Sequence, residues 1–271
     1  MRCSESAITE PLAGTAPLAR WWWLIEVPGA WGRDAVADCR VAAVRTLAST
    51  SARRVLLIRR PGRHPAANDA TLRVWFAGGL PGDPPTRVAV AADPEEILSW
   101  PDAGPPRALP DPLAPVLAVC TNSSRDLCCG IDGRALVTAL STAGTDRVWE
   151  CSHLGGHRFA PTALHVPTGL VYGRLPVEVA QRLVDVGPDT HSASWLRGRS
   201  ALDAPAQAAE IALLRQDVHP DPRVAQVDVT ADEAVVTFAG SPVVRLRKET
   251  GPSRSVSCGR DAEASRSWVP F

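Results

Sequence analysis

The stretch that decides the fold covers residues 115–151 and reads PVLAVCTNSSRDLCCGIDGRALVTALSTAGTDRVWEC. Its apolar run at 115–119 predicts a strand, and Asp132–Thr142 predicts a helix with Asp132 as its N-cap. Arg147–Cys151 then predicts a second strand. We interpret the stretch as a strand–helix–strand unit with a cysteine-rich loop between the first strand and the helix.

The segments on either side extend this unit into a repeated order of elements. Both halves of the region between residues 21 and 186 read strand–helix–strand, then strand–strand–helix, which suits the thioredoxin-like fold with its central mixed sheet and flanking helices. We therefore predict an α/β protein with two tandem thioredoxin-like lobes and a small C-terminal β extension. A single α/β sheet is the alternative. The other expected elements are strands 21–27, 53–59, 71–77, 86–91, 162–166 and 170–174, and helices 33–49, 93–100 and 176–186.

Breaks in composition divide the chain into successive segments. The proline-rich stretch between the two lobes is a linker candidate, and the Ser- and Arg-rich end is expected to be a loose tail. The expected segments are a flexible arm 1–18, an N-terminal lobe without ligands 19–100, the linker 101–114, a second lobe 115–190, a C-terminal helix with short strands 200–248, and the tail 249–271.

Composition limits the class of protein. The 271 residues hold 29 basic and 29 acidic side chains, so the net charge is zero and no broad attraction to nucleic acid is expected. No run of about eighteen apolar residues occurs, and the N-terminal MRCSESAITEPLAG lacks the apolar core of a signal peptide. We expect a cytoplasmic protein with neither nucleic-acid nor membrane partners.

Cysteine and histidine crowd into one region. Four of the seven cysteines lie between positions 120 and 151, and two histidines follow in the pattern C-x8-C…H-x3-H. The odd number and irregular spacing of the cysteines argue against a disulfide framework. Two thiolates and two imidazoles can complete a four-coordinate metal shell or hold a two-iron cluster. Eight intervening residues are long for structural zinc, which remains an alternative metal.

The surroundings of this pattern suit metal ligation. Cys129 lies just before the expected helix, whose N-terminal dipole favours the thiolate, and Gly130 leaves space beside it. Gly155 and Gly156 predict a tight turn rather than a helix between the histidines, and such a turn lets backbone N–H groups approach an anionic centre. Arg158 is a candidate hydrogen-bond donor near that centre.

Three segments carry a resemblance to a known family. They are CTNSSRDLCCG at 120–130, VWECSHLGGHRFAPTALHVPTGLVYGRL at 148–175 and, more weakly, WWWLIEVPGAWGRDAV at 21–36. They resemble the sucrase/ferredoxin-like family, whose C-terminal part is a thioredoxin-like [2Fe-2S] ferredoxin. The resemblance covers roughly residues 20–186 and makes 115–190 the ferredoxin domain.

The resemblance implies an electron carrier that serves a redox partner protein, rather than an enzyme. By motif, the cluster ligands are Cys120, Cys129, His153 and His157, with Cys128 as the alternative second cysteine. Cys129 is preferred because it directly precedes Gly130. Two imidazole ligands imply a potential above that of all-cysteine clusters, and one that falls as pH rises. No pair of carboxylates supports a sucrase activity.

The remaining cysteines leave two other functions open. A thiol–disulfide oxidoreductase would use Cys128 and Cys129 or Cys120, although no C-x-x-C motif occurs. A structural zinc module for protein interaction is the second alternative. Cys151 is expected to pack in the core, and the cysteines not expected to be ligands are Cys3, Cys39 and Cys258.

Overall fold

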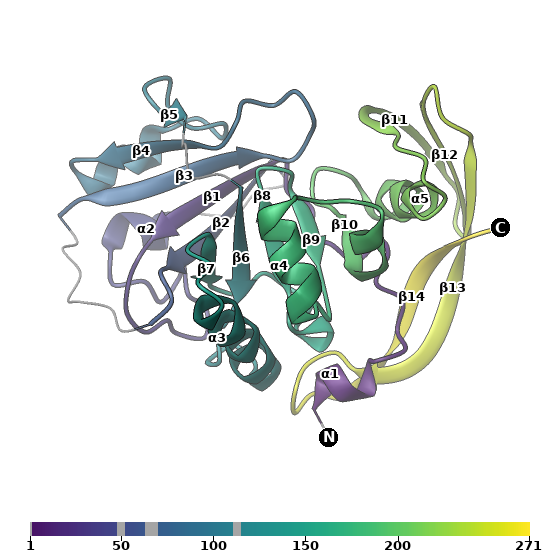
Figure 1. The fold of residues 1–271 in the computed structure, drawn as a ribbon, viewed down its shortest axis with the longest axis horizontal. Helices are drawn as coiled ribbons and strands as arrows, with labels where there is room; N and C mark the ends of the chain where they lie inside the picture. The colour runs from purple at the N-terminus through teal and green to yellow at the C-terminus, as the bar shows by residue number, and fades with distance from the viewer. Residues whose placement is uncertain (1, 48–51, 63–69, 111–114) are drawn as a thin grey trace.

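The structure is a computed structural model that describes residues 2–47, 52–62, 70–110 and 115–271. Within these residues a mixed sheet of ten strands has the order β10-β9-β8-β6-β7-β2-β1-β3-β4-β5. A separate antiparallel sheet has the order β11-β12-β13-β14. Figure 1 shows helices α3 and α4 in front of the large sheet and the small sheet along one side of the molecule. The α/β class and the second, C-terminal sheet agree with the prediction.

The N-terminal lobe is built on β1, whose sequence WWWLIE is apolar on both faces. β1 pairs in parallel with β2 and antiparallel with β3, and β3 pairs antiparallel with β4, so the order is β2-β1-β3-β4. The elements of this lobe are β1 (Trp21–Glu26), α2 (Ala42–Thr46), β2 (Arg53–Arg59), β3 (Leu72–Gly78), β4 (Arg87–Ala91) and η1 (Pro94–Ser99).

The second lobe repeats this topology. β6 pairs in parallel with β7 and antiparallel with β8, and β8 pairs antiparallel with β9, so the order is β7-β6-β8-β9. β2 and β7 join the two lobes as antiparallel neighbours, which makes the sheet continuous. The elements are β6 (Val116–Cys120), η2 (Cys129–Gly133), α3 (Arg134–Thr142), β7 (Val148–Cys151), η3 (His157–Phe159), β8 (Ala163–Val166), β9 (Leu170–Tyr172) and α4 (Val177–Asp185).

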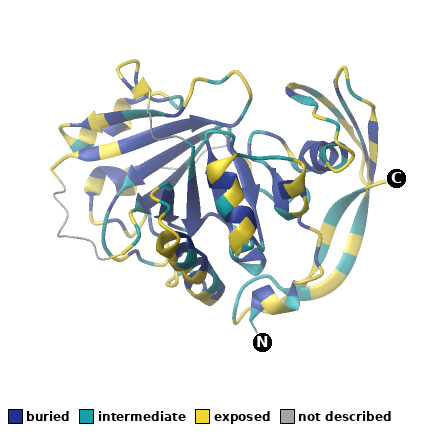
Figure 2. Cartoon of the chain, in the orientation of Figure 1, coloured by how far each residue is buried: buried dark blue, intermediate teal, exposed yellow. Residues whose placement is uncertain are grey.

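The core lies on both faces of the large sheet, where buried residues concentrate in Figure 2. Successive side chains of β1 point to opposite faces, as strand geometry requires. Trp23 and Ile25 pack in one apolar cluster with residues of α2 and η1. Trp22 and Leu24 pack in another cluster that spans both lobes and includes Cys120, Cys129, Cys151 and Leu154. The segments around Cys120 and Cys129 therefore pack against apolar side chains supplied in part by the N-terminal lobe.

The C-terminal region forms a layer of its own on one side of the second lobe. α5 begins at the N-cap Asp203, whose carboxylate accepts a hydrogen bond from the Ala206 N–H at 3.1 Å, and its apolar residues pack on the small sheet. η4 (His191–Trp195) and β10 (Leu196–Arg199), the edge strand of the large sheet, lead into this layer. The elements of the layer are α5 (Ala204–Leu214), β11 (Asp221–Val229), β12 (Glu233–Ala239), β13 (Val244–Ser255) and β14 (Ala262–Pro270).

The two ends of the chain contain more regular structure than their composition indicated. Residues 249–271, expected to be a loose tail, supply the end of β13 and all of β14. The arm 1–18, expected to be flexible, contains α1 (Cys3–Ser6), in which Cys3 is only 1% exposed. α1 lies beside the far end of the β13–β14 hairpin (Figure 1). The two polar chain ends are ordered by contacts with each other, and the local pattern of residues does not predict such contacts.

Two further expectations differ from the structure or lie outside it. The helix expected over 33–49 is shorter, because α2 begins only at Ala42 and residues 34–38 form a turn closed by the Asp38 N–H on the Asp34 carbonyl at 2.7 Å. Positions 48 and 49 lie outside the described residues, as do 111–114 of the linker. The described end of that linker includes β5 (Leu109–Pro110), which pairs with β4.

Candidate metal centre

Cys120 stands at the end of β6, where the strand meets two neighbours. Its N–H donates to the Thr162 carbonyl at 2.9 Å, and the next N–H, of Thr121, donates to the Cys151 carbonyl at 3.1 Å. The Cys120 side chain is 1% exposed. Backbone bonds on both sides therefore hold this thiol at a defined position inside the lobe.

Cys129 begins η2, the π-helical turn that leads directly into α3. The close approach of this helix start to β6 depends on glycine. A Cβ added at Gly133 would lie 2.0 Å from the Cys120 carbonyl oxygen, and one at Gly130 would lie 2.5 Å from the Ser123 Cβ. The sequence CGIDG therefore lets the helix N-terminus pack against the strand end, which brings Cys129 toward Cys120.

The two histidines flank a glycine turn, as the sequence indicated. Gly155 and Gly156 have φ values of 98° and 71°, in the region that favours glycine, and η3 starts only at His157. The buried Arg197 from β10 donates to the Gly155 carbonyl at 2.8 Å. A Cβ at Gly156 would lie 2.4 Å from an Arg197 guanidinium nitrogen. Arg197, which is distant in sequence, therefore holds the turn through its guanidinium group.

Three of the four proposed ligands come together. The ligand atoms of Cys120, Cys129 and His153 all lie within 4.8 Å of one another, and we name this set the Cys120 group. His157 lies beside it, with its ring centroid 5.1 Å from that of His153 and its Nε2 3.7 Å from Asp126 Oδ2. Among the described residues, the buried Nδ1 atoms of His153 and His157 have no hydrogen-bond partner.

The electrostatics of the Cys120 group favour one thiolate. A hydrogen bond from the Cys129 thiol holds the pKa of Cys120 well below its usual range, and His153 lowers it further. The same bond, together with burial, raises the pKa of Cys129. Burial lowers the pKa of His157, although the Asp126 carboxylate opposes that shift, so the imidazole stays in its neutral, metal-binding form. The two thiols share one proton, and a metal cation that binds them can displace this proton.

The donor set fits a metal centre. Two thiols and two imidazoles suit the irons of a cluster and zinc alike, and the unpartnered buried Nδ1 atoms have unused lone pairs or protons. These residues could therefore hold a metal ion, and the donor set fits more than one metal.

The neighbouring Cys128 belongs to a different set. The ligand atoms of Cys3, Asp126, Cys128 and Cys258 also lie within 4.8 Å of one another, and we name this set the Cys128 group. Consecutive cysteines thus direct their sulfurs to two separate groups. The interpretation of Cys3 and Cys258 as residues without a ligand role did not anticipate this set, because they lie more than a hundred residues from Cys128 along the chain.

Other residues singled out from the sequence have different surroundings. Arg158 forms an ion pair with the buried Glu10 of the N-terminal arm, with nitrogen–oxygen distances of 2.8–3.0 Å, and so ties that arm to the histidine loop. Cys151 is buried in β7 beside Cys120, as expected. Cys39 packs in the core of the N-terminal lobe.

Sequence reasoning missed two features near the histidines. One is Arg197, whose role beneath the turn has no local signal because it lies forty residues downstream, at the start of a different strand. The other is a cavity of about 330 Å³ that reaches His153 and is lined by arginines from both lobes. These arginines are Arg33, Arg45, Arg54 and Arg125, and Asp34 is an acidic neighbour.

The comparisons with known proteins agree with the motif evidence. The chain belongs to the sucrase/ferredoxin-like family, whose model matches residues 12–197. Searches of curated proteins and of solved structures returned no match. In the part of the chain that the structure describes, every helix is too short or too polar to cross a bilayer.

Proposed function

We propose that this member of the sucrase/ferredoxin-like family is an electron-transfer protein whose [2Fe-2S] cluster is bound by Cys120, Cys129, His153 and His157. The observation that carries the proposal is the Cys120 group: three donor atoms from two separate segments of the second lobe lie within 4.8 Å of one another, and the His157 imidazole lies beside them as a fourth candidate ligand. The region that matches the family model includes all four residues.

When bound, a cluster with two imidazole ligands supplies one-electron transfer at a higher potential than an all-cysteine cluster, because neutral imidazole adds less negative charge. The chain's own residues determine the surroundings. The apolar cluster that contains Cys120 and Cys129 also contains Trp22, Trp149 and Leu154, which exclude water from the thiol side. Arg197 holds the turn between the two histidines and thereby positions both imidazoles.

The histidine side is the side open to a partner. The His157 side chain is 13% exposed, whereas Cys120 and Cys129 are each 1% exposed. The cavity at His153 is lined by four arginines and by Asp34, so its net charge is positive. Such a surface favours a redox partner protein with an acidic face, because complementary charge speeds encounter. Electrons would enter or leave on the imidazole side.

The test is iron and acid-labile sulfide analysis of protein purified without oxygen. The proposal expects red-brown protein whose visible absorption is bleached by dithionite. The variants His153→Cys and His157→Cys should keep iron but lower the reduction potential, because a thiolate adds negative charge. His219→Cys, at an exposed histidine, is the matched control and should leave the potential unchanged. Colourless wild-type protein without iron or sulfide would overturn the proposal.

Structural zinc is the second candidate, because the Cys120 group offers the thiol and imidazole ligands that zinc also takes. Zinc without iron in the purified chain, retained in the Cys128→Ser variant and lost in Cys120→Ser, would select it. The oxidoreductase alternative gains no support in its Cys128–Cys129 form, because these two cysteines belong to different sulfur groups instead of forming one dithiol.

A further inference from the structure

The Cys128 group joins three segments that are far apart in the chain. Cys3 belongs to α1, Cys128 directly precedes η2 as its N-cap residue, and Cys258 belongs to the turn between β13 and β14. The Sγ atoms lie 3.4 Å apart for Cys3 and Cys128, 3.4 Å for Cys128 and Cys258, and 3.6 Å for Cys3 and Cys258. All three cysteines are free thiols. Three sulfurs therefore form a nearly equilateral triangle.

This triangle has the dimensions of one face of a zinc coordination tetrahedron. Zinc binds cysteine sulfur at about 2.3 Å with tetrahedral angles, which separates two ligand sulfurs by roughly 3.8 Å. The observed separations are a few tenths of an ångström shorter, so a small outward movement of each thiolate would accommodate the ion. Three closely packed thiols without a cation have no comparable attraction, because S–H is a weak donor and sulfur a weak acceptor.

Asp126 supplies a fourth ligand atom. Its Oδ1 lies 3.7 Å from the Cys3 Sγ. The Cys128 N–H donates to Oδ1 at 2.9 Å, and the Ser257 hydroxyl and the Cys258 N–H donate to Oδ2 at 2.9 Å and 3.0 Å. These bonds fix the carboxylate in its buried position and hold it in the ionised form that a cation requires. Ligating carboxylates in metal sites are oriented by partners of this kind.

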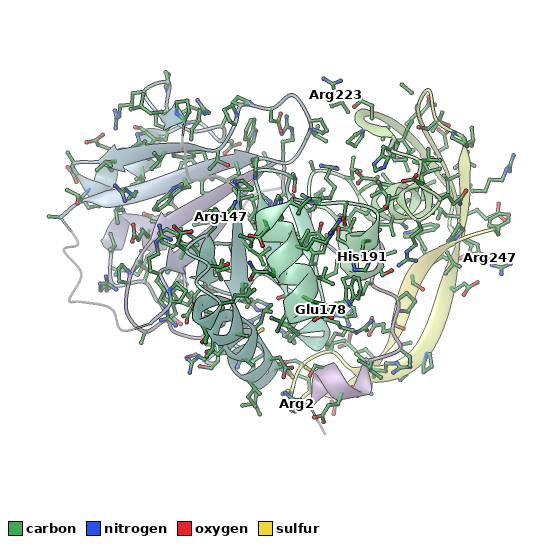
Figure 3. All side chains as sticks on the ribbon, viewed as in Figure 1. Arg2, Arg147, Glu178, His191, Arg223 and Arg247 are labelled. Carbon is green, nitrogen blue, oxygen red and sulfur yellow. The ribbon has the colours of Figure 1, made fainter. Side chains whose placement is uncertain are left out.

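Contacts that do not involve sulfur hold the three segments at this point. Arg2, labelled in Figure 3 beside α1, forms an ion pair with Asp132 of η2 at 2.5 Å, and the Ser4 hydroxyl donates to the same carboxylate at 3.1 Å. Arg254 of β13 donates to the Ser6 carbonyl and to the Thr9 hydroxyl. The three sulfurs thus meet where both chain ends contact the segment that carries Cys128 and η2.

We propose that Cys3, Cys128, Cys258 and Asp126 hold a structural zinc ion, separate from the centre proposed at the Cys120 group. The two ligand sets share no residue. Three thiolates select a soft or borderline cation, and a buried set of four donors from fixed segments is a closed tetrahedral site, which structural zinc prefers. The ion would lock the N-terminal arm and the β13–β14 hairpin onto the loop that carries Cys129.

The first experiment measures zinc, iron and acid-labile sulfide in the full chain. We expect about one zinc per chain that survives gel filtration with a weak chelator, in addition to iron. Cys258→Ser, in a half-exposed turn, should lose that zinc while iron content and visible spectrum stay unchanged. Cys39→Ser, a buried cysteine outside both groups, is the matched control and should retain the zinc. Zinc that stays in Cys258→Ser would overturn the proposal.

A second measurement needs no variant. X-ray absorption at the zinc edge of the wild-type chain should report three sulfur ligands and one oxygen. Two sulfurs with two nitrogens would instead assign the zinc to the Cys120 group and overturn the proposal, and so would copper in place of zinc. Alkylation without prior reduction shows whether any two of Cys3, Cys128 and Cys258 form a disulfide. Such a disulfide would also contradict the proposed zinc site. Iron and sulfide analysis judges the proposed cluster independently of all these results.

Discussion

The Cys120 group and the Cys128 group meet at two consecutive residues, Cys129 and Cys128, yet they are assembled differently. The Cys120 group takes its members from the end of β6, the start of η2 and the loop after β7, all in one lobe and within 34 positions of the chain. The Cys128 group takes members from both chain ends as well as from that lobe. The difference teaches that neighbouring thiols can belong to separate sites when a helix start turns their side chains in different directions.

The largest effect expected is that a variant in either group loses the metal of that group and keeps the metal of the other. Cys120→Ser should abolish iron and sulfide binding, because an alcohol is a poor ligand for iron, while zinc at the Cys128 group remains. Cys258→Ser should lose the zinc and keep the iron and sulfide. Metal and sulfide analysis of the two variants side by side measures both outcomes. Loss of both metals from each variant would mean that the groups form a single site.

The next effect concerns the approach of η2 to β6, on which both groups depend. Gly133→Ala places a methyl group 2.0 Å from the Cys120 carbonyl oxygen, at an ordinary φ of −66°. We expect a loss of about 3 kcal/mol in the free energy of unfolding, because the clash is with backbone. Urea unfolding measures it. The control is Gly144→Ala, at φ +84° with open space around it, where the loss should be only about 1 kcal/mol. Equal losses would contradict the steric explanation.

Acid should weaken the lobe that carries both groups. Burial of His165 in β8 lowers its pKa to about 4, so below the usual value of 6.5 the unfolded chain binds a proton that the folded chain does not. Stability is therefore full above pH 6.5 and falls as pH decreases toward 4, by about 2 kcal/mol between pH 6.5 and 5. Urea titrations of wild type and His165→Leu measure the slope, which should be shallower in the variant. Parallel slopes would exclude this histidine as the source.

The smallest effect expected is a change at the Cys128 group that leaves the Cys120 group unaffected. Arg2→Ala removes the ion pair with Asp132, in which the side chains are 30% and 19% exposed, so the stability loss should stay below about 1 kcal/mol. Because only the arm is loosened, Cys3 should be alkylated faster and zinc released sooner, with iron unchanged. Arg247→Ala, which removes a more exposed ion pair on β13, is the control and should change neither rate. Faster iron loss in Arg2→Ala would indicate that the arm supports both groups.

Much of the large sheet could be predicted because its signals are local. The apolar runs that form β1, β2 and β6 and the proline-started α4 lie close to their expected positions. The glycine turn between His153 and His157 was predictable for the same reason, since Gly155 and Gly156 report their own backbone preference. The short α2 was not, because the turn at residues 34–38 depends on side-chain and backbone contacts that periodicity does not encode.

The sequence by itself determined the repeated order of elements, the family and the crowding of Cys120, Cys129, His153 and His157 into one lobe, because spacing along a strand, a helix or a short loop is information the chain carries locally. Only the tertiary structure decided that the lobes share a sheet through β2 and β7, that Arg197 supports the histidine turn, and that Cys3 and Cys258 meet at Cys128. Such meetings arise when distant segments bury apolar surface together, and that free energy belongs to the packed whole and not to any one segment.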